Sequence, residues 1–494
     1  MLKLLAFDYG ASSGRAIIGF YDGSKMELNE VHRFSNDPIM VNGSLYWNVL
    51  GLFHEMKRGM QKCVKNGNRD ISGIGVDTWG VDFGLLDANG DLLGNPYHYR
   101  DLRTEGMIEL AASRMPKDEI YKTTGIAFLK FNTLYQLLSM KEGNSPILEK
   151  AKTMLFMPDL LNYFLTGVKS TEYTIASTSQ MLSAQTRSWA NDMLSRIGIS
   201  CDILTGIVTP GVLIGDVRED VAGESGVGRV PVIAVAEHDT GSAVVSVPAG
   251  TGRYAYISSG TWSLMGVESD VPVINDDTYR LNYTNEGGAA DTIRLLKNIM
   301  GLWICQECKR HWDKTDEVLG FDTLELLAGE SEPFKCFIDP DDDMFYSPGR
   351  MPGKVAEYCM KTGQYVPRTK GEIMRCIMES LALKYREAVE GLEKIVGYDL
   401  PVIHVVGGGS KNTMLNRFTA NSTGKRVIAG PVEATATGNL AMQLLALGEV
   451  SDISEARTIV RNSFPMQEYM PSEREEWDEA YGRYLNKVRG HIML

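Results

Sequence analysis

The sequence lacks several features that mark whole classes of protein, and each absence narrows what the chain can be. It has only seven cysteines in 494 residues, odd in number and scattered along the chain, so we expect reduced thiols rather than a disulfide framework. No apolar run approaches the length of a membrane span, and the opening stretch reaches Asp8 too soon for a signal-peptide core. We therefore expect a cytoplasmic protein with no membrane partner.

An excess of positive charge is also missing. The chain has 50 basic and 63 acidic residues, which gives a net charge of -13. A protein of this charge produces no overall field that would attract a phosphate backbone, so no nucleic-acid partner is expected. A small anionic substrate could still bind in a cleft, where local cations or backbone N–H groups would hold it.

The stretch FDYGASSGR, residues 7–15, looks like a phosphate-binding loop but lacks the lysine that ends a Walker-type loop. The residues after its turn, AIIGFY, are β-formers rather than a helical pattern. A second stretch, RYAYISSGTWSLMGVESD, begins at Arg253 and repeats the order of strand, Gly/Ser turn and strand. Small residues let backbone N–H groups approach phosphate oxygens closely. The sequence therefore predicts two hairpins that hold one nucleotide, with ordinary glycine-containing hairpins as the alternative.

Strand and helix patterns alternate in both halves of the chain, which predicts α/β layers rather than a helical bundle or a β-sandwich. The length of 494 residues fits two large domains at roughly 100 to 200 residues each, or three. We place the boundary after the stretch PVIAVAEHDTGSAVV. This gives an N-terminal domain of residues 1–246 and a C-terminal domain of residues 247–494, each with one of the two hairpins.

The stretch AEHDTGSA carries the clearest chemical signal. Asp239 follows a buried strand pattern and opens a predicted helix, where the helix dipole favours an ionised carboxylate. Such a carboxylate can accept the proton of a substrate hydroxyl during phosphoryl transfer. An aspartate that only caps its helix is the alternative.

Asp8 is the second candidate acid, since it ends the first strand beside a phosphate-binding turn. Magnesium prefers one or two carboxylates together with water and phosphate oxygens, so this position suits Mg²⁺. A buried aspartate that caps its own turn is the alternative.

Two further turns, one rich in glycine and one polar, are weaker candidates for contacts with a ligand. Residues 407–409 are three glycines between a strand and a helix pattern, where backbone could lie flat against a base or ribose, although a tight turn would also explain them. The segment YRDLR, residues 99–103, could hydrogen-bond several sugar hydroxyls or form a solvated loop.

Two clusters of potential ligands are expected to hold no ion. Cys305, Cys308 and His311 lie in a helical pattern without a second ligand pair. Residues 339–343, DPDDD, lack the downstream glycine and glutamate of an EF-hand, which predicts a solvated acidic loop.

Taken in order, the motifs resemble the FGGY family of carbohydrate kinases. They are DYGASSGR, DTWGVDF, YRDLR, HDTGSA, SSGTWSLMG, NEGG, KNIMGLW, and GGG followed by AGPVEATATGN. The resemblance extends from the first strand to about residue 445. It implies an α/β fold of two ribonuclease H-like domains of the actin and hexokinase type, which close over a sugar and Mg-ATP in a central interdomain cleft.

The resemblance also implies roles for the residues at matching positions. Asp239 would accept the proton of the sugar hydroxyl, and Asp8 would help to hold Mg²⁺. The sugar would contact Gly80, His238, Asp239, Thr240 and Asn298, with Arg100 and Asp101 as further candidates from the polar segment. ATP would contact Ala11, Ser12, Ser13, Gly14, Arg15, Thr261, Gln306 and Gly408.

The implied activity is ATP-dependent phosphorylation of a ketose, with L-rhamnulose at O1 as the expected acceptor. The segments FLKFNTLYQL and MPDLLNYFLTG favour this acceptor. L-fuculose or a xylulose is the alternative acceptor, because one inverted hydroxyl is decided by the geometry of the pocket. From a different class, the chain could be a nucleotide-driven switch of the actin or chaperone kind. Such a switch would need no equivalent of Asp239.

Overall fold

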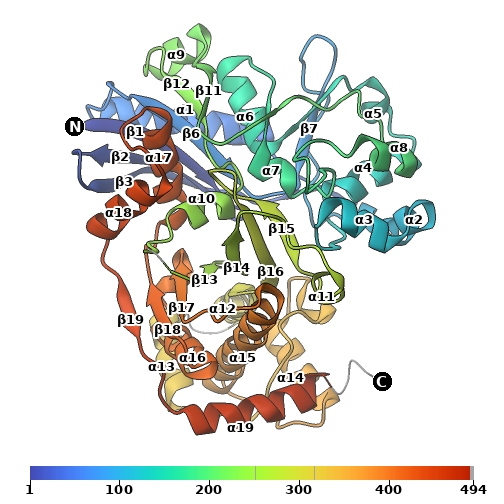
Figure 1. Cartoon of the computed structure of the whole chain (residues 1–494), viewed down its shortest axis with the longest axis vertical. Helices are drawn as coiled ribbons and strands as arrows, with labels where there is room; N and C mark the ends of the chain where they lie inside the picture. The colour runs from blue at the N-terminus through green and yellow to red at the C-terminus, as the bar shows by residue number, and fades with distance from the viewer. Residues whose placement is uncertain (251, 316–317, 490–494) are drawn as a thin grey trace. The chain divides into compact units, whose positions relative to one another are not determined.

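The computed structural model describes residues 1–250, 252–315 and 318–489 (Figure 1). The chain forms two compact units. Unit 1 comprises Met1–Gly250, Glu268–Leu296 and Ala434–Phe464, and unit 2 comprises Thr251–Val267, Lys297–Glu433 and Pro465–Leu494. The chain thus returns twice to unit 1 after leaving it. The predicted boundary between residues 246 and 247 divides the chain into family domains rather than compact units. It therefore stays a prediction.

Unit 1 is built on a six-stranded sheet in the order β11-β12-β6-β1-β2-β3. Its strands are β1 (Leu2–Tyr9), β2 (Ser13–Tyr21), β3 (Met26–Ser35), β6 (Gly73–Thr78), β11 (Val212–Asp216) and β12 (Pro231–Ala234). Strands β1, β6 and β12 are parallel, whereas β2, β3 and β11 run antiparallel to their neighbours. The carboxyl ends of β1, β6 and β12 therefore share one edge of the sheet.

The two faces of β1 are covered by different helices, because successive side chains of a strand point to opposite faces. Leu5 and Phe7 pack with Met56 and Met60 of α1 (Val49–Lys65). The intervening residues Leu4 and Ala6 pack in a second cluster that includes residues of α17 (Ala434–Ala446). Both faces of the sheet are thus buried, which explains the continuous apolar run at the start of the chain.

The first predicted hairpin is confirmed. Strands β1 and β2 pair antiparallel with Asp8 opposite Arg15, and Gly10 N donates to Ser13 O at 3.0 Å to close the turn. Gly14 leaves room for the Phe34 ring, because a Cβ atom there would lie 2.1 Å from that ring.

The rest of unit 1 adds three two-stranded sheets, a third core and the helices on it. The remaining elements of this unit up to residue 250 are β4 (Ile39–Val41), β5 (Ser44–Tyr46), β7 (Phe83–Leu86), α2 (Met107–Arg114), α3 (Lys117–Thr124), α4 (Thr133–Glu142), α5 (Pro146–Lys150), β8 (Thr153–Phe156), α6 (Met157–Thr166), β9 (Thr171–Glu172), α7 (Tyr173–Ser177), α8 (Asn191–Ile197), β10 (Ile207–Val208), α9 (Glu219–Ser225) and α10 (Asp239–Val245). The three two-stranded sheets are β4-β5, β7-β8 and β10-β9. Three later helices also belong to this unit, namely α17, whose bounds are given above, α11 (Asp276–Arg280) and α18 (Ile453–Ser463).

The second sheet has seven strands in the order β15-β16-β14-β13-β17-β18-β19. Its strands are β13 (Ala255–Ser259), β14 (Trp262–Ser269), β15 (Thr284–Gly287), β16 (Ile293–Met300), β17 (Val402–Val406), β18 (Arg426–Ala429) and β19 (Gln467–Tyr469). The second predicted hairpin is confirmed, since β13 and β14 pair antiparallel with Ser259 opposite Ser263. Strands β13, β17 and β18 are parallel. Both sheets are mixed and both carry helices, so the predicted α/β class is confirmed.

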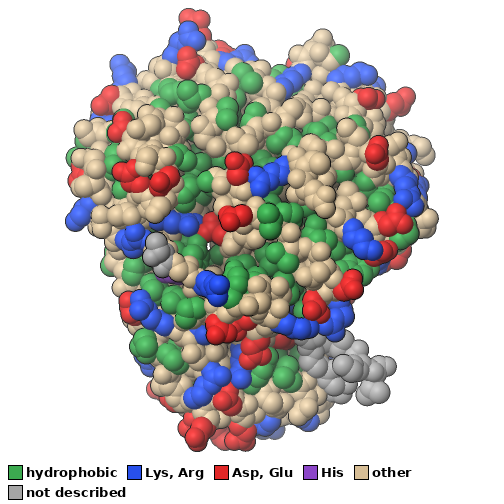
Figure 2. All heavy atoms as spheres, in the orientation of Figure 1, with side chains coloured by type: hydrophobic (Ala, Val, Ile, Leu, Met, Phe, Trp, Pro, Cys, Tyr) green, Lys and Arg blue, Asp and Glu red, His purple; other side chains and the backbone are tan. Residues whose placement is uncertain are grey.

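The helices of unit 2 are α12 (Trp303–Thr315), α13 (Phe321–Glu330), α14 (Met351–Lys361), α15 (Lys370–Val396), α16 (Thr413–Thr423) and α19 (Arg474–Tyr484). Cys305 and Cys308 lie on α12 and are buried, as the helical pattern predicts. Among the described residues, no helix combines the length and the apolar character needed to cross a membrane. Acidic and basic side chains are interspersed over the face shown in Figure 2.

The prediction of a solvated acidic loop at residues 339–343 was wrong for its first part. Asp339 is buried, and Lys384 of α15, also buried, donates to its Oδ1 at 2.9 Å and lies 3.0 Å from Asp341 Oδ2. Met300 N also donates to Asp341 Oδ1 at 2.8 Å. The buried ammonium group of Lys384 needs charged partners, and these two aspartates supply them.

Candidate active site

Two carboxylates lie side by side where β1 and β6 end. Asp8 and Asp77 are register partners on these parallel strands, and both are buried. Asn439 of α17 donates to Asp77 Oδ2 at 2.6 Å, whereas the buried Oδ1 atom of Asp77 has no hydrogen-bond partner among the described residues. Burial and the nearby charges of Asp8 and Asp239 raise the pKa of Asp77 well above its ordinary value. This edge of the sheet therefore brings together carboxyl oxygens, which are the ligands that Mg²⁺ prefers.

Asp239 follows the third parallel strand, β12, and is the first residue of α10. Thr78 N donates to Glu237 O at 2.9 Å, which joins this elbow to the end of β6. The Asp239 carboxylate accepts through Oδ1 from Thr240 N at 2.6 Å and from Thr240 Oγ1 at 3.2 Å. About a third of its side chain (32%) is exposed. The capping position of α10 is taken by His238, so the alternative that Asp239 is the N-cap was wrong.

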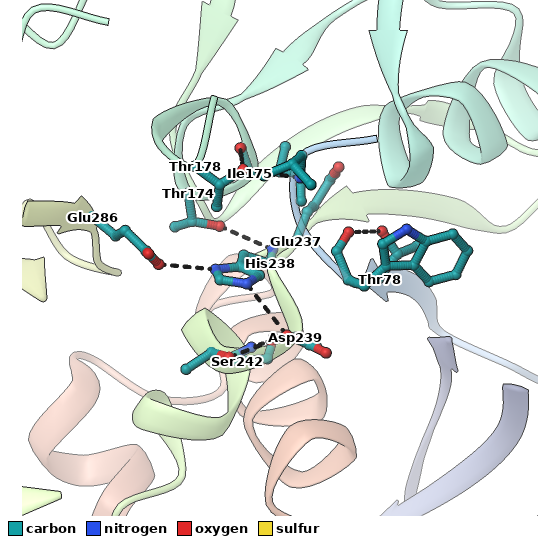
Figure 3. A network of polar contacts seen from close by, with 12 residues as sticks. Thr78, Thr174, Ile175, Thr178, Glu237, His238, Asp239, Ser242 and Glu286 are labelled. Atoms are coloured by element: carbon teal, nitrogen blue, oxygen red, sulfur yellow. Dashed lines mark hydrogen bonds and ion pairs between the residues drawn. The ribbon is translucent and has the colours of Figure 1, made fainter. Parts of the chain in front are cut away.

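A buried chain of charged groups orients His238 beside Asp239 (Figure 3). His238 Nε2 lies 3.4 Å from Asp239 Oδ1, and His238 Nδ1 lies 3.3 Å from Glu286 Oε2. Arg294, which is fully buried, reaches both His238 Nδ1 at 3.1 Å and Glu286 Oε2 at 3.2 Å. Burial alone would raise the pKa of Glu286, but hydrogen bonding to His238 and the charge of Arg294 hold it below its ordinary value. The imidazole is thus fixed between two carboxylates.

A second buried cluster supports the backbone of the elbow. His238 N donates to Thr174 Oγ1 at 3.2 Å (Figure 3). That hydroxyl donates to Glu172 Oε2 at 2.6 Å. Glu237 N donates to the same Glu172 oxygen at 3.2 Å. Burial raises the pKa of Glu172 to about 7, and it raises those of Glu237 and Asp159 well above their ordinary values. These neighbouring carboxyl groups therefore retain protons that exposed ones would release.

Of the other residues expected to contact the sugar, Gly80 lies closest in the chain to this edge. It follows β6 two residues after Thr78, which pairs with His238. A Cβ atom at Gly80 would lie 3.2 Å from Thr178, so the chain passes closely there. Asp101 is buried, and its carboxylate accepts from Leu45 N at 2.8 Å and Arg103 N at 3.0 Å.

These hydrogen bonds show that Asp101 stabilises its own turn. Arg100 Nε donates to the hydroxyl of Tyr99 at 3.3 Å. The sugar-binding roles of Arg100 and Asp101 stay predictions, as does that of Asn298, which lies part-buried on β16 in unit 2.

The residues expected to bind ATP occur in both units. In unit 1, Arg15 of β2 forms an ion pair with Asp8, and the exposed Ser12 lies at the hairpin turn with Ala11. The turn is held by Asn36, whose backbone N donates to Ser12 O at 3.1 Å.

In unit 2, Thr261 at the tip of the second hairpin donates to Gln306 Oε1 of α12 at 3.3 Å, so these two candidates lie together. The three glycines after β17 differ in their surroundings. A Cβ atom at Gly409 would lie 1.9 Å from Ser259 Oγ, whereas one at the exposed Gly408 would meet nothing within 4 Å. Close packing therefore explains Gly409, and open space is left at Gly408.

Three residues of this edge were missed from the sequence. Asp77 lies near the end of a buried strand, as Asp8 does, and it is the first residue of the DTWGVDF motif. An aspartate in this position was the signal that could have identified it. Glu286 belongs to the NEGG motif, which carried no assigned role. Arg294 stands in an apolar strand and gave no signal.

Comparisons with known proteins identify the family of this chain. Residues 3–246 match the N-terminal domain of the FGGY family of carbohydrate kinases, and residues 255–447 match its C-terminal domain. The chain is 46% identical over 487 residues to a rhamnulokinase of Bacteroides thetaiotaomicron, covering 99% of each chain. It is 45% identical to a rhamnulokinase of Oceanobacillus iheyensis, covering 94% of this chain and 97% of that protein.

Solved structures show the same fold. A gluconate kinase of Lactobacillus acidophilus superposes with a TM-score of 0.82 at 17% identity, over 98% of this chain and 97% of that one. A ligand-bound xylulose kinase of the same organism superposes with a TM-score of 0.81 at 16% identity, with the same coverage. Both family domains and near-full-length relatives therefore identify this chain as a member of the FGGY family of carbohydrate kinases.

Proposed function

We propose that this chain transfers the γ-phosphoryl group of ATP to O1 of L-rhamnulose, giving L-rhamnulose 1-phosphate and ADP. The observation that carries the proposal is the part-exposed Asp239 carboxylate, which stands at the start of α10 beside a buried and oriented His238. The near-full-length relatives named rhamnulokinase support this acceptor. The gluconate and xylulose kinases, at under 20% identity, support the fold alone.

In the proposed reaction, Asp239 accepts the proton of the O1 hydroxyl. The O1 atom then bonds to the γ-phosphorus, the bond from that phosphorus to the β,γ-bridging oxygen breaks, and ADP leaves. A positioned carboxylate of this kind contributes to the rate, while most of the catalysis comes from orientation and charge neutralisation. His238 and Thr240 bind sugar hydroxyls on either side of the base, and the Glu286–Arg294 pair keeps the imidazole in place.

ATP is bound by the small residues of the two hairpins, with Thr261 and Gln306 on the second, and the adenosine lies against Gly408. The open space at Gly408 supports this last contact. The unpaired Oδ1 atom of Asp77 beside Asp8 fits a magnesium ion, so Asp8 and Asp77 would hold Mg²⁺ directly or through water. When bound, the ion supplies positive charge that offsets the negative charge of the phosphates.

Phosphorus NMR of the product tests this proposal. The protein is incubated with Mg-ATP and L-rhamnulose, and the proton-coupled spectrum of the new ester is recorded. Transfer to O1 predicts a triplet, because the phosphate then couples to the two protons of a CH₂ group. A doublet would show transfer to a secondary hydroxyl, and release of inorganic phosphate without an ester would contradict kinase activity on this sugar.

A further inference from the structure

Three cysteines that are far apart in the sequence meet in the core of unit 2. Cys336 precedes the acidic run at 339–343, Cys359 lies on α14 and Cys376 on α15 (Figure 1). Their sulfur atoms all lie within 4.8 Å of one another, and all three residues are at least 97% buried. None of them forms a disulfide. This three-thiol cluster has no part in the proposed kinase reaction.

Hydrogen bonds of the backbone on either side of Cys336 hold the cluster in place. The backbone N–H groups of Phe334 and Ile338 donate to Glu379 Oε2 and Ser380 Oγ of α15, each at 2.9 Å. Gln364, just after α14, accepts from Phe337 N at 2.9 Å and donates to Phe337 O at 2.8 Å. The segment carrying Cys336 is therefore fixed to both helices that carry the other two thiols, so the three sulfurs are preorganised.

The thiols also bond to one another. Hydrogen bonds from Cys336 and Cys376 lower the pKa of Cys359 to about 5, which favours its thiolate form relative to that of an isolated buried thiol. A thiolate is the form that attacks electrophiles and binds soft ions.

The three sulfur ligands and their burial together limit which kind of ion or small molecule the cluster can bind. Among the described residues, no histidine or carboxylate joins the three sulfurs, so the fourth ligand that a structural zinc site requires is missing. Three thiolates around a monovalent or divalent ion would leave net negative charge in the core, which is costly. A trivalent centre bound by three sulfurs is neutral and needs no fourth ligand.

We propose that Cys336, Cys359 and Cys376 form a binding site for a trivalent thiophilic centre of the arsenite class. Arsenous acid, As(OH)₃, is itself neutral, and its uptake is a ligand exchange without oxidation or reduction. Each sulfur forms one bond to arsenic as one As–O bond breaks, and each thiol proton leaves with a hydroxide as water. One As(OH)₃ and three thiols thus give As(SR)₃ and three water molecules.

Native mass spectrometry of the full chain with arsenite tests the proposal. The protein is first reduced with a phosphine and freed of reductant. We expect one adduct per chain, with a mass gain of one arsenic less three hydrogens, and a fall in free thiols from seven to four. Binding by only two thiols would retain a hydroxyl and give an adduct heavier by one water, which would overturn the proposal. Failure of the reduced protein to bind arsenite at millimolar concentration would do the same.

Two variants locate the site. Cys359→Ser should lose the three-thiol adduct, while the matched control Cys308→Ser, which changes an equally buried thiol of α12, should keep it. The opposite pattern would assign arsenite to Cys305 and Cys308 and would contradict the proposal. If Cys359→Ser does not fold, Cys336→Ser gives the same comparison, and the adduct mass of the unmodified chain decides by itself.

Discussion

Asp239 is the residue whose chemistry most directly separates a sugar kinase from a nucleotide switch. As the first residue of α10 it gains from the helix dipole, and its carboxylate is already hydrogen-bonded to Thr240. It stays accessible while its neighbours Asp8 and Asp77 are buried. A base needs this combination of a charge that is stabilised and an oxygen that a substrate can reach.

Replacing Asp239 by asparagine should therefore abolish most turnover without unfolding the protein. The amide keeps the size of the side chain but cannot take the hydroxyl proton, so kcat should fall by roughly 10² to 10⁴. Melting temperature and sugar affinity should change little. Steady-state kinetics, sugar binding and thermal melting check this, with Asp220→Asn in the first turn of α9 as the matched control. A kcat within a few-fold of the parent value would remove Asp239 from the mechanism.

Gly408 offers a second test at the level of single residues. A leucine there would extend into the open space assigned to adenosine, because nothing lies within 4 Å of a Cβ atom at this position. We expect the KM for ATP to rise roughly tenfold, which corresponds to about 1.4 kcal/mol of lost binding, with the sugar KM and the melting temperature unchanged. Gly206→Leu, at another exposed glycine with open surroundings, is the control. Equal ATP affinity in both variants would place the adenosine elsewhere.

At the scale of elements, α10 is positioned by its contact with α17. A Cβ atom at Gly438 would lie 1.7 Å from the Ser242 carbonyl oxygen, so only glycine allows the two helices to approach this closely. Gly438→Ala must push α10 and its Asp239 away, and overpacking of this kind costs about 1–3 kcal/mol.

We expect Gly438→Ala to lower both the melting temperature and kcat. Gly223→Ala in α9, where a Cβ atom meets nothing within 4 Å, should be neutral or slightly stabilising, because alanine is the better helix former. Thermal melting and kinetics of the two variants check this. Unchanged values for Gly438→Ala would show that the helices have room to adjust.

The buried carboxyl cluster beneath the elbow should make stability depend on pH. The folded protein retains protons on Glu172, Glu237 and Asp159 that the unfolded chain releases above its ordinary carboxyl pKa of 4.5 for glutamate. This contribution to stability is therefore complete below the ordinary pKa values. It is lost as the pH rises through about 7 for Glu172 and through the raised pKa values of Glu237 and Asp159.

Glu237→Gln removes one of these titrating groups, so the variant should gain stability relative to the parent as the pH rises from 5 to 8. Urea unfolding at several pH values checks this. Glu219→Gln, at an exposed position in the first turn of α9, should leave the slope of the parent unchanged. Parallel curves for the parent and Glu237→Gln would contradict the account of the cluster.

Local sequence was sufficient to predict those elements whose signals are short. Each hairpin is a small-residue turn between β-formers, and the elbow at Asp239 is an apolar strand followed by a helix. Glu286 and Arg294 could not be placed in this way, because they approach His238 from strands about 50 residues later in the chain. The Lys384–Asp339 pair and the three-thiol cluster also bring together residues that are far apart in the chain. The roles of the ligand-binding residues themselves stay predictions.

At the scale of the whole molecule, the residues proposed to bind ATP come from both units, and so do those proposed to bind the sugar. The base and its supporting groups belong to unit 1, whereas Thr261, Gln306 and Gly408 belong to unit 2. The proposed reaction uses residues of both units, so neither unit is expected to be active by itself.

The central claim is that this chain is an ATP-dependent kinase whose preferred acceptor is L-rhamnulose. The most direct measurement is kcat/KM for ADP release with Mg-ATP across a panel of L-rhamnulose, L-fuculose and D- and L-xylulose. A kinase of the proposed specificity should release ADP only when a ketose is present and should use L-rhamnulose with the highest kcat/KM. A higher value for L-fuculose or a xylulose would contradict the substrate, and ADP release that is independent of any sugar would contradict the kinase itself.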